Sequence, residues 1–378
     1  MSWLCNRDDF DLNQQEILNT IFEDRDESWW IRGYAGTGKT MLLAYLALDY
    51  FDDGLNCVYA TYTHALKDRV TEGMKELKGN KIPPVMTVDD YLSRRERYDV
   101  VLLDEVQDLE IKQVKKLVDR GERLILSGDI NQSVFNHAIK PNDLARLLGS
   151  PEIVELIDIH RLPEAISWGS HLIYEESQSA EGAEVIKIKN SSITIVKAKS
   201  IEEEVKWIYE QALKESTEGK PSVVLFTTHE QIRTFARSLF LEMGYPHARM
   251  EKKGTIHKLL NESFRITNIP VRYFGGANGD DLGNASNRKL VLLMTIQSAK
   301  GLEFNSVFMP FMTKDRNPTP YQILAKGKED EWKRRFLYVS ITRTRLNFYA
   351  SYTGEVSEYF ELIDTPQMRK SYLKYISI

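Results

Sequence analysis

The apolar residues of this chain form short continuous runs, and these alternate with longer stretches of helical periodicity. A β-rich run occupies residues 57–65 and breaks into a helix near Ala65, and apolar runs occupy residues 29–31, 100–103 and 124–127. Such runs are typical of parallel strands buried on both faces of a sheet. Between them, residues 11–22 show the spacing of an amphipathic helix, with Asp11 or Asn13 as its cap. The first half therefore predicts alternating strands and helices.

The same alternation restarts after a small, polar and acidic segment at residues 176–183, which has the composition of a linker. The expected strands of the second half are residues 193–196, 222–226, 290–294 and 347–351, and the expected helices are residues 201–214, 230–243 and 334–345. Residues 275–284 form a turn-rich loop. We expect an α/β fold of two tandem units with mainly parallel sheets, residues 1–178 and residues 183–378.

Composition narrows the class of protein without identifying it. At 378 residues the chain exceeds the size at which a single core keeps growing, which agrees with two domains. A net charge of −5 gives no global attraction to nucleic acid, so any such contact needs a local groove. Only Cys5 and Cys57 are present, and no apolar stretch approaches the length of a membrane span. We expect a soluble cytoplasmic protein with no membrane partner.

Residues 33–40 (GYAGTGKT) lie between the run at 29–31 and an apolar helical pattern at 41–48. Glycines let backbone N–H groups turn towards an anion, and the following helix N-terminus adds partial positive charge. Lys39 is then expected to reach the β- and γ-phosphates of a nucleotide, and Thr40 to bind Mg²⁺. The alternative is a glycine-rich turn without a ligand, which the strand-loop-helix context disfavours.

Polar residues follow two other predicted strands. Asp104 and Glu105 come directly after the strand at 100–103, where ligands bind in open α/β sheets. Asp104 is placed to hold Mg²⁺ through its water shell, and Glu105 to polarise an attacking water. A helix cap is the alternative. After the next strand, Gln132 is a candidate γ-phosphate sensor and Phe135 a candidate base-stacking residue.

Three further positions carry weaker signals. Gln15 precedes the first strand and could read an adenine edge with its amide, although a glutamine on a helix is more often solvated. Thr63 and Thr87 follow strands and are suited to contact a sugar-phosphate backbone, but ordinary helix caps explain them equally well. Arg343 lies between apolar helical turns rather than in a charged, solvent-exposed helix face, which favours a specific functional position for its side chain.

Taken in order, these segments resemble the UvrD/Rep-like branch of superfamily 1 DNA helicases, from Leu12 to about Ser351. The matching motifs are residues 33–40 (I), 60–65 (Ia), 104–108 (II, DExQD), 128–132 (III, GDxxQ), Arg161 with Pro163, 295–304 (V) and 338–345 (VI). The string at 298–304 (SAKGLEF) is the most diagnostic of them.

This resemblance implies two RecA-like P-loop NTPase domains, with ATP and Mg²⁺ bound between them. The implied catalytic residues are Lys39, Asp104, Glu105, Gln132, Arg161 and Arg343, with Thr40 and Asp104 as metal ligands. The implied nucleotide-binding residues are Gln15, Gly33, Ala35, Gly36, Thr37, Gly38, Lys39, Thr40, His160, Gly301 and Glu303. The implied nucleic-acid contacts are Thr63, His64, Thr87, Phe135, His137, Thr295 and Gln297.

The sequence departs from the family pattern in several places. Gln297 replaces the usual motif V histidine, and His160 stands where the family has an adenine-stacking tyrosine. Residues 136–138 replace a glycine- and arginine-containing stretch, so that His137 is the remaining candidate for one stacking position. No room exists between residues 87 and 100, or between 276 and 290, for large accessory (1B and 2B) domains. We therefore expect a minimal motor core.

Two functions follow from the resemblance. The first is an ATP-dependent translocase or helicase on single-stranded DNA, moving 3′ to 5′, with RNA as a further substrate to test. The second is a nucleic-acid-stimulated ATPase switch that regulates a partner protein and unwinds little by itself. In either case a protein partner would supply duplex engagement or regulation. A scaffold that binds nucleotide without hydrolysis is disfavoured, because Glu105 and both arginines are present.

Overall fold

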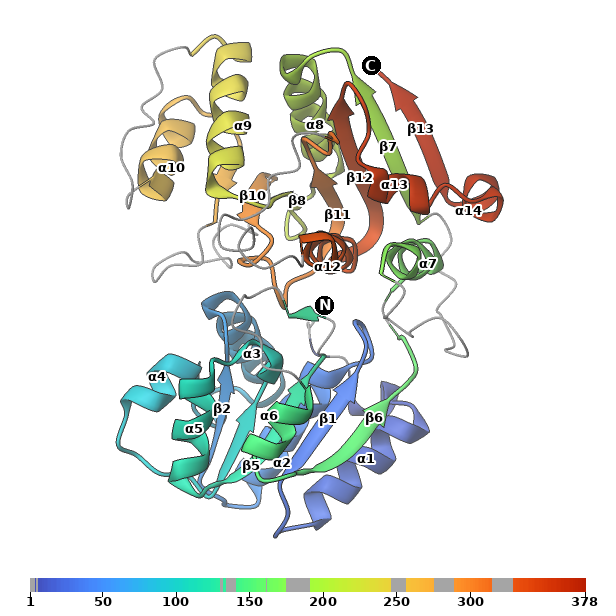
Figure 1. Cartoon of the computed structure of the whole chain (residues 1–378). Helices are drawn as coiled ribbons and strands as arrows, with labels where there is room; N and C mark the ends of the chain where they lie inside the picture. Colours follow the sequence, from blue (N-terminus) through green and yellow to red (C-terminus); the bar gives the residue numbers. More distant parts are fainter. Residues whose placement is uncertain are drawn as a thin grey trace. The chain divides into compact units, whose positions relative to one another are not determined.

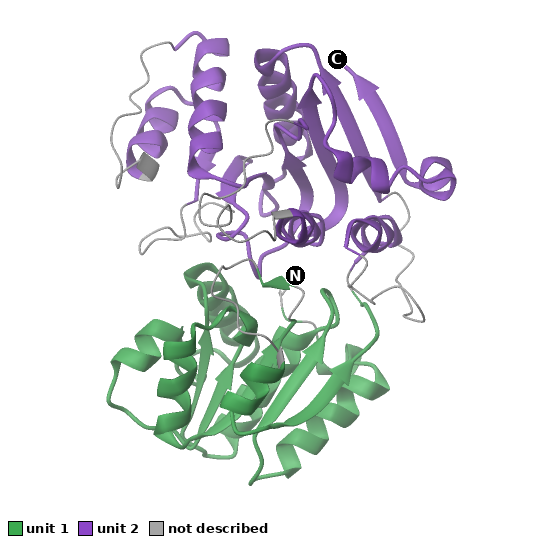
Figure 2. Ribbon diagram, in the orientation of Figure 1, with its two compact units in different colours: residues 1–161, 182–184 green, residues 162–181, 185–378 purple. Residues whose placement is uncertain are grey.

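A computed structural model describes residues 4, 6–129, 132–133, 141–160, 162–174, 191–245, 256–274, 289–314 and 329–378. The chain divides into two compact units, residues 1–161 with 182–184 and residues 162–181 with 185–378 (Figure 2).

Unit 1 is built on a six-stranded sheet of order β3-β2-β4-β5-β1-β6, in which every neighbouring pair is parallel (Figure 1). Its strands are β1 (Trp29–Gly33), β2 (Cys57–Thr61), β3 (Val85–Thr87), β4 (Val100–Leu103), β5 (Arg123–Gly128) and β6 (Glu152–Leu156). Its helices are α1 (Leu12–Glu23), α2 (Lys39–Asp52), α3 (His64–Lys78), α4 (Val88–Ser93), α5 (Ile111–Arg120) and α6 (Pro141–Leu147), with short 3-10 turns η1 (Arg7–Asp9) and η2 (Val106–Asp108). The parallel order brings the carboxyl ends of all six strands to one edge.

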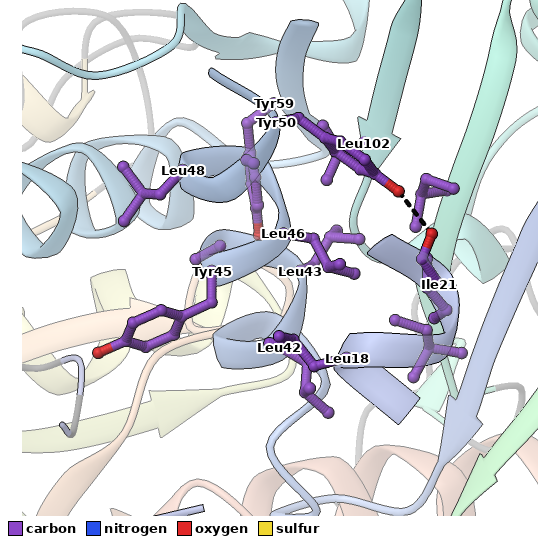
Figure 3. Packing of buried hydrophobic residues seen from close by; sticks show 14 of the residues in the cluster. Leu18, Ile21, Leu42, Leu43, Tyr45, Leu46, Leu48, Tyr50, Tyr59 and Leu102 are labelled. Atoms are coloured by element: carbon purple, nitrogen blue, oxygen red, sulfur yellow. Dashed lines mark hydrogen bonds between the residues drawn. The ribbon is translucent and has the colours of Figure 1, made fainter. Parts of the chain in front are cut away.

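Both faces of this sheet are buried, because alternate residues of each strand enter different clusters. Ile31, Leu102 and Ile125 pack with α1, α2 and α3, while their neighbours Trp30, Val101 and Leu126 pack with α4, α5 and α6. Figure 3 shows the first cluster, in which the Tyr50 hydroxyl donates to the Ile21 carbonyl oxygen at 2.8 Å. The fully apolar strands expected from the sequence are thus confirmed as central strands.

Unit 2 carries a seven-stranded sheet of order β13-β7-β12-β11-β8-β10-β9, also parallel throughout (Figure 1). Its strands are β7 (Ser192–Ala198), β8 (Ser222–Phe226), β9 (Val271–Tyr273), β10 (Val291–Thr295), β11 (Phe304–Met309), β12 (Thr344–Thr353) and β13 (Leu373–Ser377). Its helices are α7 (Glu164–Ile173), α8 (Ile201–Glu215), α9 (His229–Glu242), α10 (Ile256–Ile266), α12 (Glu329–Ile341), α13 (Glu358–Leu362) and α14 (Pro366–Ser371). Helices α8, α9 and α10 share one buried cluster with β8, β10, β11 and β12.

Helix α7 belongs to unit 2, although it precedes the segment expected to link the domains. Arg334 of α12 donates to the Ile173 carbonyl oxygen at 3.2 Å, and the ring centroids of Tyr174 and Tyr338 lie 5.8 Å apart. A side chain at Gly169 would lie within 2.3 Å of the end of the Ile193 side chain in β7, so Ile193 would have to shift to admit it. The division therefore falls at residues 161 and 162 rather than at residues 178 and 183, because α7 finds its packing partners in unit 2.

The boundary between α12 and β12 differs from the one expected from the sequence. The cation-bearing helix expected at 334–345 ends at Ile341, and the strand expected at 347–351 begins already at Thr344. Cys57 lies in β2 with a free, buried thiol. The segments at 176–183 and 275–284, and Cys5, lie outside the described residues. No helix within the described ranges is long and apolar enough to cross a membrane.

Candidate functional site

The loop between β1 and α2 wraps around the side chain of Lys39. Its ammonium group donates to the carbonyl oxygens of Gly33 at 2.8 Å and Tyr34 at 2.7 Å. Gly38 caps α2 with φ 92°, a conformation that favours glycine. At Gly33 a side chain would come within 2.8 Å of the Leu156 carbonyl oxygen and 2.7 Å of the Thr37 hydroxyl. Strand β6 therefore supports the loop from the side, and the turn keeps Lys39 at its centre.

Asp104 lies at the carboxyl end of β4 and is almost completely buried. Its carboxylate accepts hydrogen bonds from the hydroxyls of Tyr59 at 2.9 Å, of Ser127 and of Thr40. Burial raises the pKa of this carboxyl above its ordinary value, and the charge of Glu105 raises it further, while the three hydroxyls oppose the shift. The bond to Thr40 brings the start of α2 and the end of β4 together.

Glu105, the next residue, has a left-handed backbone with φ 60°. This conformation is uncommon for a residue with a side chain. One of its carboxylate oxygens accepts a hydrogen bond from the side-chain amide of Gln107. The structure thus places both expected carboxylates at one strand end, with Asp104 buried and Glu105 partly exposed.

Gln132 follows β5 and is also buried. Its amide donates to the Asp129 carboxylate at 2.9 Å, and its backbone N–H donates to the Asp129 carbonyl oxygen at 3.0 Å. Both bonds hold Gln132 against Asp129 at the end of β5, the strand next to β4. Phe135, His137 and Arg161 lie outside the described residues.

Helix α1 contacts the phosphate loop through Gln14. The Gln14 amide donates to the Thr37 carbonyl oxygen at 3.0 Å, and its side-chain oxygen completes a capping box with Asp11. Gln15, the expected base-reading residue, is exposed and donates instead to the Phe10 carbonyl oxygen at 2.7 Å. In this structure it is thus Gln14, and not Gln15, that reaches the loop.

His160 joins the same group of residues from the segment after β6. Its Nε2 lies 2.6 Å from the Asp11 carboxylate, and its backbone N–H donates to the Gly36 carbonyl oxygen at 3.1 Å. Asp11 also accepts from the Gln14 backbone N–H at 2.6 Å. The imidazole is therefore anchored beside the loop by the residue that caps α1.

Thr63, His64 and Thr87 lie at the carboxyl ends of the paired strands β2 and β3. The Thr63 hydroxyl accepts from the Leu66 N–H at 3.2 Å, and the Thr87 hydroxyl accepts from the Asp90 N–H at 3.2 Å. His64 is the first residue of α3. Both threonines act as N-caps, which is the alternative that the sequence left open, and the neighbouring helix starts place them at one sheet edge.

In unit 2, Thr295 ends β10 and is buried. Its hydroxyl contacts the Ser298 hydroxyl at 2.9 Å and accepts from the Ser298 N–H at 3.2 Å. Gln297 stands in this turn and is partly exposed, and Gly301 has φ 76°. The turn orders the start of the SAKGLEF segment.

Glu303 and Arg343 occupy the same unit. Glu303 pairs with Arg345 at 2.8 Å. Arg343 follows α12 and is 2% exposed, and its guanidinium donates to the Val339 carbonyl oxygen at 3.1 Å. Phe304 donates its backbone N–H to the Arg343 carbonyl oxygen at 2.9 Å, so that the two motif segments are joined.

The sequence reasoning missed the residues that support Asp104. Tyr59 and Ser127 lie on β2 and β5, the strands on either side of β4, and their positions become recognisable only once the strand order is known. Gln14 had a signal in the sequence, since it shares a helical face with Ile17, Leu18 and Ile21 at spacings of three, four and seven residues.

Two families match this chain. Residues 10–192 match an AAA domain, and residues 277–355 match the UvrD-like helicase C-terminal domain. The phosphate loop, the buried Asp104 and the parallel sheets define a P-loop nucleotide-binding protein. More particularly, the chain is similar to the UvrD-like helicases, whose C-terminal domain matches residues 277–355.

The relatives cover only parts of the chain. The ATP-dependent DNA helicase Rep of Buchnera aphidicola subsp. Schizaphis graminum is 29% identical over 158 residues, which are 42% of this chain and 21% of the relative. A probable DNA helicase II homolog of Rickettsia conorii is 32% identical over 74 residues, 19% of this chain and 11% of the relative. These matches therefore span a small share of the relatives' own lengths.

A solved structure, a variant of S. cerevisiae Dbp5 bound to RNA and ADP BeF3, matches with a TM-score of 0.56 at 11% identity. The match covers 97% of this chain and 89% of that chain. At this identity the likeness concerns the fold, and it agrees with two RecA-like α/β units.

Proposed function

We propose that this chain hydrolyses ATP at the phosphate loop and uses the turnover to translocate on single-stranded DNA, as a helicase or translocase. The observation that carries the proposal is the hydrogen bond between Thr40 and Asp104. It joins the two segments that a P-loop NTPase uses to hold a metal-bound triphosphate, with Lys39 on one side and Glu105 on the other.

The side chains present fit ATP with Mg²⁺. Hard oxygen ligands suit this ion, which usually takes one or two protein ligands and completes its shell with phosphate oxygens and water. Thr40 and Asp104 would supply those ligands, and no cluster of three or more metal-binding side chains occurs among the described residues. The bound ion would neutralise developing charge on the phosphates. Lys39 would exchange its two carbonyl partners for phosphate oxygens.

The remaining assignments belong to the same proposal. Glu105 would polarise the attacking water, Gln132 would sense the γ-phosphate, and Arg161 and Arg343 would stabilise charge in the transition state. Thr63, Thr87 and Thr295, with their neighbours, would grip the sugar-phosphate backbone. We propose movement from 3′ to 5′, a protein partner for duplex engagement, and a reducing cytoplasmic setting, which the buried free thiol of Cys57 supports.

The test is ATP turnover with no nucleic acid, single-stranded DNA, duplex DNA and RNA, together with unwinding of a forked duplex. Turnover should rise with single-stranded DNA and fall steeply as salt increases, because phosphate contacts release counterions. Lys39→Ala and Glu105→Gln should each lower it at least about a hundredfold. Turnover that stays close to wild type in both variants would contradict the site. Turnover that ignores every nucleic acid would contradict the motor and indicate an ATPase switch.

A further inference from the structure

Gln107 is a side-chain hydrogen-bond partner of Glu105. It lies in the 3-10 turn η2, directly after the left-handed backbone of Glu105, and is 3% exposed. Its amide nitrogen donates to one oxygen of the Glu105 carboxylate. An ionised carboxylate can only accept hydrogen bonds, so the amide must turn its NH₂ group towards Glu105.

The side-chain oxygen of the same Gln107 amide has a different environment. The Gln107 side-chain oxygen is buried and accepts no hydrogen bond from any described residue. Leaving a buried acceptor unpaired costs about 1–3 kcal/mol. A methionine or leucine would fill the same space without that cost, so packing alone does not explain a glutamine here. The chain retains the amide for its N–H donor.

Gly128 at the end of β5 fixes where this amide lies. A side chain at Gly128 would overlap the Gln107 side-chain oxygen and would come within 2.9 Å of Val106 Cγ1. Gly128 is held in turn by its register with Arg32 of β1, at the base of the phosphate loop. The amide is thus confined between a central strand and the Glu105 carboxylate.

We propose that Gln107 is a positioning residue for ATP hydrolysis: it holds the Glu105 carboxylate at a fixed angle, with Gly128 providing the space that this requires. The inference rests on the proposed function, in which Glu105 polarises the attacking water. Glu105 itself has an uncommon, left-handed backbone angle, and a carboxylate on such a turn needs a second anchor to keep one rotamer. Misplacing a catalytic group by about 1 Å can cost a hundredfold in rate.

The test compares Gln107→Met, which keeps the volume and removes the donor, with Gln113→Met as a matched control. Gln113 is also buried in unit 1, with its amide donating to Asp89 at 2.9 Å and its oxygen accepting from the Glu110 N–H at 2.8 Å. Gln107→Met should lower kcat about ten- to a hundredfold and leave the affinity for ATP within about threefold. Gln113→Met should lower the melting temperature and leave kcat within about twofold.

Two further variants separate positioning from folding. Gln107→Glu, which keeps the shape but cannot donate when ionised, should lose at least as much kcat as Gln107→Met. In a Glu105→Gln background, Gln107→Met should change the residual turnover by less than about twofold, because the two residues act as a unit. The proposal is overturned if Gln107→Met lowers kcat by the same factor in the Glu105→Gln background as in the wild-type protein. It is also overturned if Gln107→Met alone keeps kcat within about twofold of wild type.

Failure of the positioning role of Gln107 can be told apart from failure of the proposed ATPase function. If the wild-type chain shows no Lys39-dependent ATP turnover, the proposed function itself is wrong. If that turnover is present and Gln107→Met matches wild type, only the positioning role is wrong. If Gln107→Met lowers the melting temperature and weakens ATP binding together with kcat, Gln107 serves folding, and the proposal is overturned as well.

Discussion

The side-chain amide of Gln14 donates to the carbonyl oxygen of Thr37, 3.0 Å away and 23 positions further along the chain. This bond ties the first helix to the middle of the phosphate loop. A side chain at Gly38 would come within 2.7 Å of the same amide nitrogen, so the loop and the helix fit closely.

Replacing Gln14 with alanine should therefore weaken nucleotide binding. Loss of one buried hydrogen bond to the loop costs about 1 kcal/mol, which corresponds to roughly a five- to tenfold higher Kd. Titration of a fluorescent ATP analogue measures this change. Gln15→Ala is the control, because the exposed Gln15 amide donates to the Phe10 carbonyl oxygen and not to the loop, and its Kd should match wild type. Equal effects of the two variants would show that the loop does not depend on Gln14.

Replacing Asp104 with asparagine should abolish ATP turnover and yet stabilise the nucleotide-free protein. Because burial raises the folded-state pKa of this carboxyl above its ordinary value of 3.8, the folded protein binds the proton more tightly than the unfolded chain. Keeping Asp104 ionised then costs stability at neutral and alkaline pH, and the cost fades as the pH falls through the folded pKa towards 3.8.

Thermal unfolding without Mg²⁺ at pH 8 should show a higher melting temperature for Asp104→Asn than for wild type. Each kcal/mol added to the free energy of unfolding should raise it by about 2–4 °C. The gain should shrink as the pH is lowered towards 3.8. Asp119→Asn, at an exposed position of α5, provides the control for the change in net charge. A lower melting temperature for Asp104→Asn at pH 8 would contradict the sign of this argument.

Gly33→Ala should damage both the fold and the nucleotide site. At φ 156° and with the Leu156 carbonyl oxygen in contact, the new methyl group must displace β6 or the loop, at about 1–3 kcal/mol. Gly54→Ala is the comparison, because Gly54 also has positive φ but open space around it. Urea unfolding should show a smaller loss for Gly54→Ala, and only Gly33→Ala should lose nucleotide affinity.

Cys57 should be inert to thiol reagents in the folded protein. Burial raises the pKa of its thiol to about 12, so that very little thiolate exists at pH 8. In a Cys5→Ala variant, a chromogenic disulfide reagent should release no colour until denaturant is added, and should then report one thiol per chain. Rapid reaction without denaturant would mean that β2 opens readily.

The sequence predicted the strands of this fold better than the side-chain contacts of its site. The run at 222–226 coincides with β8, and 100–103 coincides with β4, because fully apolar runs fit only strands buried on both faces. Strand β11 follows directly on the SAKGLEF motif and was not predicted, since its polar Asn305 and Ser306 interrupt the apolar pattern. Strand β13 is also missing from the prediction, because four of its five residues are exposed at a sheet edge.

At the candidate site, too, the sequence motifs predicted residue positions better than side-chain contacts. Motif spacing selected Lys39, Thr40 and Asp104, and the structure brings Thr40 to Asp104, while their role at a nucleotide stays a prediction. It did not distinguish Gln14 from Gln15, for which the helical face was the better guide. Whether Arg161 and Arg343 act on the same nucleotide remains a prediction, because it depends on two separately folded units.

The boundary between those units falls inside the tripeptide Arg161-Leu162-Pro163. The three clusters described above each lie within one unit, so that each unit carries a core of its own. A gene fragment for residues 1–161 would therefore keep the phosphate loop, Asp104 and Glu105 with their own sheet, whereas a cut in the polar segment after residue 175 would leave α7 without its packing partners. For dissecting this protein into separately expressed halves, the position of one ten-residue helix decides where to cut.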